Sequence, residues 1–393
     1  MKYDYIIIGA GISGLYMGYR LIKSNPKLKI TILENNKRIG GRAKVDMFYG
    51  TKVLSGAGVG RYKKDKRLLK ILKELKIPIQ TYTVKINSIG FRKINILKTV
   101  NQLKIKYRRN PIHITFKKFA TKHLGLKKYN KFKLSAGYTD YENEDVYSVL
   151  YHYGMEDNFG GWKAFSVDWK KLYNELAKRI GTNKIKTSHE VVKIKREGDS
   201  FIVKTNNSKL FETKKIILAS TINTVRKLLN NDIYNYIESQ PFIRTYGKFS
   251  KKSSQLINEK LHTFSVVKGP LQKLIPMNKD KGIYMICYND NENALALKSK
   301  LKNSKTNRNY FCMLIEKALG IQTELSMIGM RAYYWTEGTH YYKPLRNDMT
   351  IKKLIKQAQN PDENIYVVGE LISSNQGWTE GCFESVDKIF EMV

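Results

Sequence analysis

A short glycine-rich segment near the start of the chain, residues 9–14 (GAGISG), limits the possible folds more than any other part of the sequence. It follows a continuous apolar run, Tyr3 to Ile8, which has the length of a parallel strand buried on both faces. Apolar residues then recur at helical spacing over 12–22, and a second strand-like run over 29–33 ends at Glu34. This order predicts a strand-helix-strand unit of a Rossmann-type α/β domain.

The three glycines of this GxGxxG pattern have different physical tasks. Gly9 permits a tight turn, Gly11 lets the backbone approach a pyrophosphate, and Gly14 lets the helix pack close to the strand. The helix N-terminus around Ser13 offers free N–H groups and a positive dipole end to phosphates. Glu34, at the end of the second strand, is placed to bind ribose hydroxyls. The sequence therefore predicts a dinucleotide-binding site.

Later segments favour the same domain. Residues 191–205 alternate in polarity like a strand pair around a turn, and 216–219 and 364–368 are short apolar runs of strand type. A last helix is expected over 379–390.

We therefore expect two domains, each built from separated parts of the chain. Residues 1–85, 160–240 and 345–393 are predicted to form the dinucleotide-binding domain, and 86–159 and 241–344, which lack its pattern, a substrate-binding domain.

Three further motifs point to a known family. Residues 38–42 (RIGGR) come just after Glu34, and near the C-terminus stand 367–370 (VVGE) and 377–381 (GWTEG). Together with the first glycine motif, they resemble the flavin-containing amine oxidase family, which includes monoamine, polyamine and L-amino-acid oxidases. The resemblance implies a glutathione-reductase-like FAD-binding domain, discontinuous in sequence, with an α+β substrate domain.

The resemblance also implies FAD as the cofactor and assigns residues to it. In addition to the first glycine motif and Glu34, the implied cofactor-binding residues are Gly41, Arg42, Gly58, Val191, Gly369, Glu370, Trp378 and Thr379. Monoamine oxidases tether their flavin through a cysteine, but no cysteine lies between Arg331 and Pro344. We therefore expect non-covalent FAD, with His340 as a less favoured site of covalent linkage.

The implied reaction is oxidation of a C–N bond in an amine or amino acid, with hydride transfer to flavin N5 and reoxidation by O2 to give H2O2. Two aromatic residues flank the substrate in this family, and Trp378 and Tyr341 are the candidates. Family oxidases also place a lysine near N5, where this sequence aligns Arg244, with Lys248 as the nearest lysine. Because arginine does not release a proton at neutral pH, we expect a slow reaction with O2.

The composition of the chain limits the classes of protein to which it can belong. The three cysteines form no CxxC pair and no Cys/His set at ligand spacing, so neither a disulfide scaffold nor a metal site is expected. No apolar run has the length of a transmembrane segment. A cytoplasmic location is expected; because composition and motifs resemble amine-oxidase-like proteins of large DNA viruses, this includes host cytoplasm or a virion.

The chain carries a formal charge of +37, and the charge is uneven. Residues 81–139 contain fifteen Lys and Arg and no acid, with interleaved aromatic residues, whereas 140–160 contain acids and no Lys or Arg. The basic stretch could attract nucleic acid or an anionic surface. Two alternatives therefore stay open: a UDP-galactopyranose mutase-like flavoenzyme, and an inactive flavoprotein that binds nucleic acid or an anionic assembly.

Overall fold

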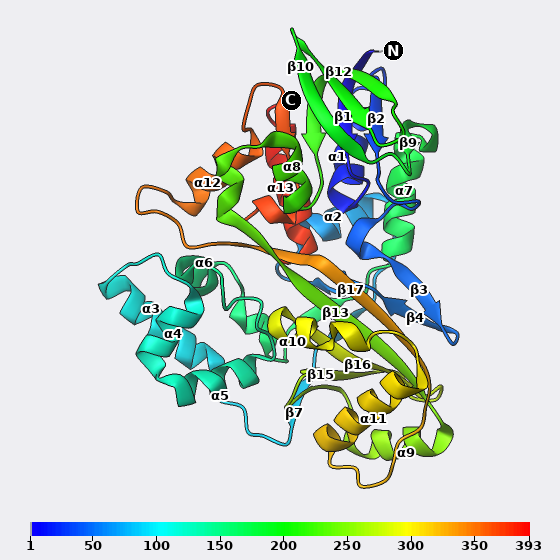
Figure 1. Ribbon diagram of the computed structural model, residues 1–393, viewed down its shortest axis with the longest axis vertical. Coiled ribbons are helices and arrows are strands. Elements are labelled where there is room, and N and C mark those ends of the chain that lie inside the picture. The colour runs from blue at the N-terminus through cyan, green and yellow to red at the C-terminus, as the bar shows by residue number, and fades with distance from the viewer. Residues whose placement is uncertain (1) are drawn as a thin grey trace.

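A computed structural model describes residues 2–393 and arranges them around two large β-sheets (Figure 1). The first sheet has the strand order β10-β11-β12-β1-β2-β9, with β18 also paired to β12. Its strands are β1 (Lys2–Ile8), β2 (Ile30–Leu33), β9 (Ile185–Lys186), β10 (Val191–Glu197), β11 (Ser200–Thr205), β12 (Leu210–Leu218) and β18 (Ile365–Val367). β1 runs parallel to β2 and β12, whereas β10 and β11 form an antiparallel extension.

Helices bury both faces of this sheet. One face packs against α1 (Ile12–Ser24), α2 (Lys66–Glu74), α7 (Trp169–Ile180) and α13 (Thr379–Phe390). The other packs against α8 (Ile222–Leu229) and α12 (Ile351–Gln359). Successive residues of β1 contribute to the two cores in turn, with Ile7 in the first and Ile6 and Ile8 in the second. This explains why the strand is a continuous apolar run.

The second sheet has the order β17-β13-β16-β15-β14-β7. Its strands are β7 (Ile86–Ile89), β13 (Ile237–Phe249), β14 (Phe264–Val267), β15 (Lys273–Asn278), β16 (Ile283–Asp290) and β17 (Met327–Tyr342). One face is covered by α9 (Lys251–Lys260), α10 (Asn291–Leu297) and α11 (Lys305–Leu319). The long strands β13 and β17 pair with each other and reach the core of the first domain through Ile237 and Tyr342. They therefore link the two domains, as Figure 1 shows.

Four helices form a separate lobe with its own core: α3 (Ile96–Arg109), α4 (Phe116–Leu124), α5 (Leu126–Ala136) and α6 (Val146–Tyr151). Most aromatic residues of the basic stretch lie in that core, namely Tyr107, Phe116, Phe119, Tyr129 and Phe132. They are packing residues, so the basic face of the lobe does not present them for base stacking. Two small sheets complete the fold: β3 (Val45–Phe48) with β4 (Thr51–Leu54), and β5 (Gly60–Arg61), β6 (Thr81–Thr83) and β8 (Lys163–Phe165).

The predicted Rossmann-type fold class is confirmed, and the expected last helix coincides with α13. The predicted boundary between 240 and 241 falls inside β13, because one strand serves both domains. None of the helices found in residues 2–393 is long and apolar enough to cross a membrane. Within the same residues, no group of three or more His, Cys, Asp or Glu side chains is arranged to hold a metal ion.

Candidate active site

A cavity of about 1200 Å³ lies between the two sheets. Its walls come from the turn between β1 and α1, from 38–43 and 54–59, from β13, β16 and β17, and from the start of α13. All predicted cofactor-binding residues line it except Gly14. The cavity is thus long enough to hold the separated motifs of the sequence in one continuous surface.

Gly9 and Gly14 have the geometry that their spacing predicts, and Gly11 faces open space. Gly9 has φ +108°, and a Cβ there would lie 2.5 Å from the Ala219 carbonyl oxygen. A Cβ on Gly14 would lie 1.9 Å from the Gly9 carbonyl oxygen, so Gly14 serves close packing beneath the cavity. A Cβ on Gly11 would meet no protein atom within 4 Å and would project into the cavity.

The first turn of α1 has no side-chain cap and no acidic residue. Its N–H groups therefore face the cavity as donors for an anion. Glu34 is buried nearby and accepts hydrogen bonds from the Ala10 N–H at 2.8 Å and from the Asn36 backbone N–H at 2.8 Å. It also accepts from the Asn36 side-chain amide at 2.7 Å. A carboxylate has about four acceptor positions, so about one position of Glu34 remains for a hydroxyl group in the cavity.

Arg42 and Glu370 connect distant motifs across the cavity wall. The Arg42 Nη1 donates to Glu370 Oε1 at 2.8 Å and to the Gly338 carbonyl oxygen at 2.8 Å. Glu370 also accepts from the Gly377 N–H at 2.9 Å and from the His340 ring. Burial opposes ionisation of Glu370, but His340 and Arg42 outweigh it and lower the pKa of Glu370 to about 2.

His340 is engaged at both ring nitrogens. Its Nε2 accepts from the Ile222 N–H at 3.2 Å, which leaves Nδ1 to donate to Glu370 at 2.5 Å. The side chain is buried and does not line the large cavity. This geometry does not present His340 for a covalent bond to a cofactor there.

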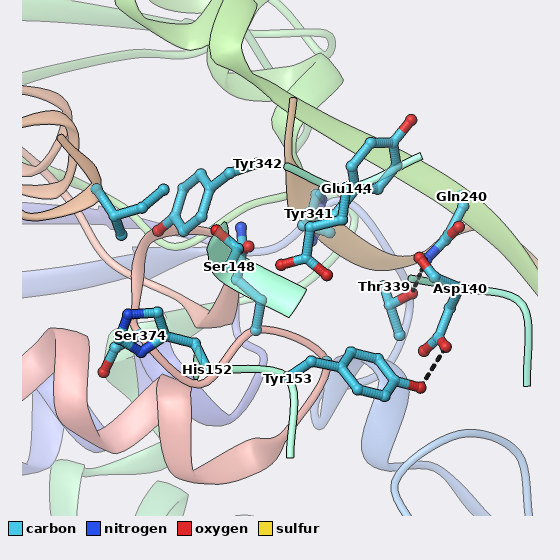
Figure 2. A pocket seen from close by; sticks show the side chains of 14 residues that line it. Asp140, Glu144, Ser148, His152, Tyr153, Gln240, Thr339, Tyr341, Tyr342 and Ser374 are labelled. Atoms are coloured by element: carbon cyan, nitrogen blue, oxygen red, sulfur yellow. Dashed lines mark hydrogen bonds between the residues drawn. The ribbon is translucent and has the colours of Figure 1, made fainter. Parts of the chain in front are cut away.

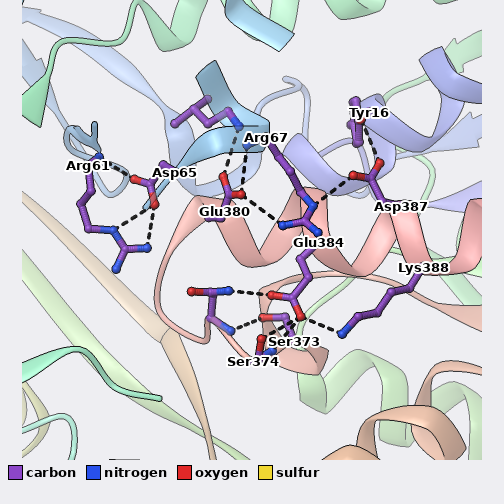
Figure 3. Close-up of polar contacts among 12 residues, drawn as sticks. Tyr16, Arg61, Asp65, Arg67, Ser373, Ser374, Glu380, Glu384, Asp387 and Lys388 are labelled. Carbon is purple, nitrogen blue, oxygen red and sulfur yellow. Dashed lines mark hydrogen bonds and ion pairs between the residues drawn. The ribbon is translucent and has the colours of Figure 1, made fainter. Parts of the chain in front are cut away.

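Trp378 lines the cavity immediately before α13 and stacks on a guanidinium. The carbon of the Arg61 guanidinium lies 3.7 Å from the centre of the Trp378 ring. Arg61 is itself buried and held by Asp65 at 2.7 Å and by Asp157 at 3.0 Å. Next to Trp378, Glu380 accepts from the Arg67 and Leu68 N–H groups at the start of α2, which fixes α13 in place (Figure 3).

Of the predicted catalytic residues, Trp378 and Arg244 line the cavity and Tyr341 does not. Tyr341 instead borders an adjoining space of about 20 Å³, with Glu144, Ser148 and His152 (Figure 2). Tyr341 pairs with Glu238 of β13, beyond the last cavity-lining residue of β17, Thr339. Thr339 approaches Gly377 in the loop of Trp378, and Tyr341 borders the small space together with Gln376 and Gly377 of the same loop.

Arg244 lies in β13 with its side chain in the cavity, and one guanidinium nitrogen is 3.2 Å from where a Gly58 Cβ would be. Its guanidinium lies 4.7 Å from the Tyr288 ring centre. Lys248, further along the strand, does not line the cavity and donates to the Lys281 carbonyl oxygen.

Several lining residues were not identified from the sequence as site residues. Tyr138, Phe242, Tyr288 and Asp290 form part of the wall, and Asp290 is held by the Thr139 N–H at 2.9 Å. An acid at the end of an apolar strand resembles an ordinary strand end, so the sequence carried no signal for Asp290.

Asp140, from the predicted acidic stretch, also reaches this wall and accepts from the Tyr153 hydroxyl at 2.5 Å. Burial, together with the nearby Asp290, raises the pKa of Asp140 to about 7. Burial also lowers the pKa of the neighbouring Lys273 to about 8. The acidic stretch therefore contributes to the cavity rather than only to the surface.

These features define a protein with a Rossmann-type dinucleotide-binding domain joined to a second sheet domain across one large cavity. Residues 7–74 match the family model described as an NAD(P)-binding Rossmann-like domain. No curated protein matches the sequence.

Solved structures give the particular fold: it is that of putrescine oxidase. Wild-type putrescine oxidase bound to putrescine aligns over 100% of this chain and 99% of its own, with a TM-score of 0.76 and 14% identity. A triple mutant from a redesign of cofactor binding in that enzyme aligns over 100% and 98%, with a TM-score of 0.75 and 15% identity.

Proposed function

We propose that this chain binds FAD non-covalently in the large cavity and oxidises the C–N bond of an amine or amino acid. The observation that carries the proposal is the single cavity that runs from the uncapped N-terminus of α1 to Trp378 and Arg244. The putrescine oxidase fold supports it.

The residues present fit a dinucleotide cofactor. The open space above Gly11 and the free N–H groups of α1 suit a pyrophosphate, and the remaining acceptor capacity of Glu34 suits a ribose. Gly41, Val191, Gly369 and Thr379 line the same cavity and are proposed to hold the rest of the cofactor with Arg42 and Glu370. The engagement of both His340 ring nitrogens supports non-covalent binding.

Bound FAD would supply the electron acceptor, taking a hydride equivalent from the carbon next to nitrogen and passing two electrons to O2 to form H2O2. The protein must orient the amine, exclude water and remove its ammonium proton. Trp378 is proposed as one apolar wall because its other face is already covered by Arg61. Asp140, whose pKa is raised to about 7, is proposed to accept the ammonium proton on its carboxylate.

Arg244 aligns with the lysine of the family oxidases and lines the cavity, and its fixed charge supports the expectation of a slow reaction with O2. O2 is the proposed acceptor, and rapid mixing of reduced protein with O2 measures the rate directly.

An absorption spectrum of the purified protein, before and after denaturation, tests the cofactor. Flavin bands that move into the supernatant support non-covalent FAD, and bands that stay with the precipitate contradict it. Anaerobic mixing of the FAD-loaded protein with amines and amino acids then tests the reaction. Loss of the flavin bands with at least one of them is expected, and a loaded protein that none reduces would refute the proposed substrate class.

The same experiments separate the alternatives. A UDP-galactopyranose mutase-like enzyme would require added reductant and would not be reduced by any amine. An inactive nucleic-acid-binding flavoprotein would show affinity for DNA or RNA that falls steeply with salt. The burial of aromatic residues in the basic lobe gives that alternative no support. A cytoplasmic or virion location is part of the proposal and rests on the sequence.

A further inference from the structure

Arg244 differs from Arg42, which also lines the cavity, and from Arg61, which stacks on the cavity residue Trp378. Arg42 is paired with Glu370, and Arg61 with Asp65 and Asp157. Arg244 is only 5% exposed, yet no carboxylate within residues 2–393 lies at ion-pair distance from it. Its Nε is fully buried and has no hydrogen-bond partner. A buried charge without a partner is costly, so this guanidinium is arranged for an anion that the chain itself does not supply.

The surroundings of Arg244 hold it in the cavity. The Phe242 and Tyr288 ring centres lie 5.4 Å and 4.7 Å from its guanidinium carbon. Aromatic faces stabilise a cation but leave the N–H groups of the guanidinium free to donate in its own plane. The planar fork of a guanidinium matches a carboxylate, with which it forms two parallel hydrogen bonds.

An acid stands on the same wall. In the β13–β16 ladder, Phe242 is opposite Asp290 and Arg244 is opposite Tyr288. Alternate residues of a strand share a face, so Arg244 and Asp290 are diagonal neighbours. Their Cα atoms are about 7 Å apart by the usual strand spacing. They form no ion pair with each other: Asp290 is held by Thr139, and Asp140 lies on the same side of the cavity. Lys273 is the buried cation next to these two acids, and Arg244 stands on the same wall without an ion pair to either of them.

We infer that Arg244 binds a carboxylate of the substrate and that Asp140 and Asp290 receive its ammonium group. The substrate class is then an amino acid rather than a simple amine or diamine. This inference rests on the proposed function, and it distinguishes the chain from the diamine in the matched putrescine oxidase complex.

A carboxylate-binding experiment tests the inference without catalysis. Benzoate is titrated into the FAD-loaded protein and followed by the flavin spectrum, with uncharged benzamide as the matched ligand. The same titration on flavin-free protein is followed by fluorescence of the cavity residues Trp335 and Trp378. Saturable binding of benzoate, at least tenfold tighter than benzamide, is expected. Equal or absent binding of both would overturn the inference.

Substitutions in β13 test whether Arg244 is the residue that binds the carboxylate. R244Q is expected to weaken benzoate binding at least tenfold, and R244K less, because lysine retains the charge but not the fork. K248Q, on the same strand but outside the cavity, is the control and should bind as the unmodified protein does. If R244Q does not fold, R244K decides: benzoate binding equal to that of the unmodified protein, or an equal loss in K248Q, would overturn the inference.

Matched substrates separate this inference from the proposed function. Ornithine and putrescine differ only in the carboxylate, so each is mixed anaerobically with the loaded protein, as are tyrosine and tyramine. Faster flavin reduction by the amino acid of either pair, by tenfold or more, supports the inference. Faster reduction by the decarboxylated amine in both pairs overturns it while leaving C–N oxidation intact. If none reduces the flavin, the proposed function fails for these substrates, and the benzoate titration still decides the role of Arg244.

Discussion

The Arg61 guanidinium lies 3.7 Å from the centre of the Trp378 ring, so one face of this tryptophan is covered by a buried cation. Only the other face is left for the cavity. A ring whose π-electrons already face one cation attracts a second cation less strongly. Trp378 is therefore suited to act as an apolar wall beside a neutral amine, and the ammonium group belongs near the acids on the opposite sheet.

Replacing Arg61 tests this arrangement. R61M would leave Asp65 buried without its ion-pair partner and would remove one of the two cations that pair with Asp157, and breaking a buried ion pair typically costs about 3–5 kcal/mol of unfolding free energy. Denaturant unfolding measures the loss, and a red-shifted fluorescence is expected as Trp378 loses its packing. K64Q removes a more exposed partner of Asp157 and should cost less than about 1 kcal/mol. Equal losses in the two variants would contradict the role given to Arg61.

Two neighbouring glycines provide a matched pair. G14A forces a Cβ to within 1.9 Å of the Gly9 carbonyl oxygen, so it should destabilise the fold severely. G11A places its Cβ in open cavity, so stability should stay within about 1 kcal/mol while FAD affinity falls at least tenfold. Thermal unfolding of the flavin-free proteins and FAD titration measure the two effects. A normal FAD affinity in G11A would show that the cofactor does not pass this turn.

Acid stability should depend on Glu370. Its pKa is lowered from 4.5 to about 2, so its ionised form contributes stability that is complete above pH 4.5 and is lost as the pH falls through 2. The shift corresponds to about 3 kcal/mol at neutral pH. E370Q should therefore be less stable at pH 7 and have a flatter stability profile between pH 5 and 2, measured by denaturant unfolding. E363Q, an exposed acid, is the control, and a similar profile for E363Q and E370Q would contradict the prediction.

The predicted features that the structure contains are those set by local backbone. The turn with Gly9 and Gly11, the position of Glu34 after β2 and the start of α13 each depend on a few consecutive residues. Contacts between strands that are far apart in the sequence were harder to predict from it. Asp290 reaches the cavity only through the β13–β16 register, which no sequence pattern specifies.

Tyr341 is the reverse case, a residue that the sequence analysis assigned to the site and that does not line the large cavity. The resemblance implies a place for this residue beside the substrate, but Thr339 is the last β17 residue that lines the large cavity, and Tyr341 borders a small adjoining space with residues of the helical lobe. A shift of two or three residues along a strand is small in sequence and decides which side chain faces a site. The Arg61–Trp378 contact was also missed, since its partners are more than 300 positions apart.

Binding of a cationic ligand should depend on the protonation of Asp140. Burial and Asp290 raise the pKa of this carboxyl to about 7, so it is mostly neutral below that pH and mostly ionised above it. An ammonium ligand should therefore bind more tightly as the pH rises from 6 to 8, by up to about tenfold per pH unit below the pKa. Benzylamine, followed by tryptophan fluorescence of the flavin-free protein, is a suitable probe because it remains cationic over this range.

D140N should bind benzylamine weakly and with little pH dependence between pH 6 and 7, because its amide does not ionise. E156Q, which removes an exposed acid paired with Lys64 outside the cavity, should retain the full pH dependence. The groups around Asp140 are Tyr153, Asp290 and Lys273, and the pKa of Lys273 is lowered to about 8. Loss of a proton from Lys273 would add its effect above pH 7.5 and would persist in D140N. A D140N profile that still changes between pH 6 and 7 would therefore assign the titration to another group and remove Asp140 from the proposed proton transfer.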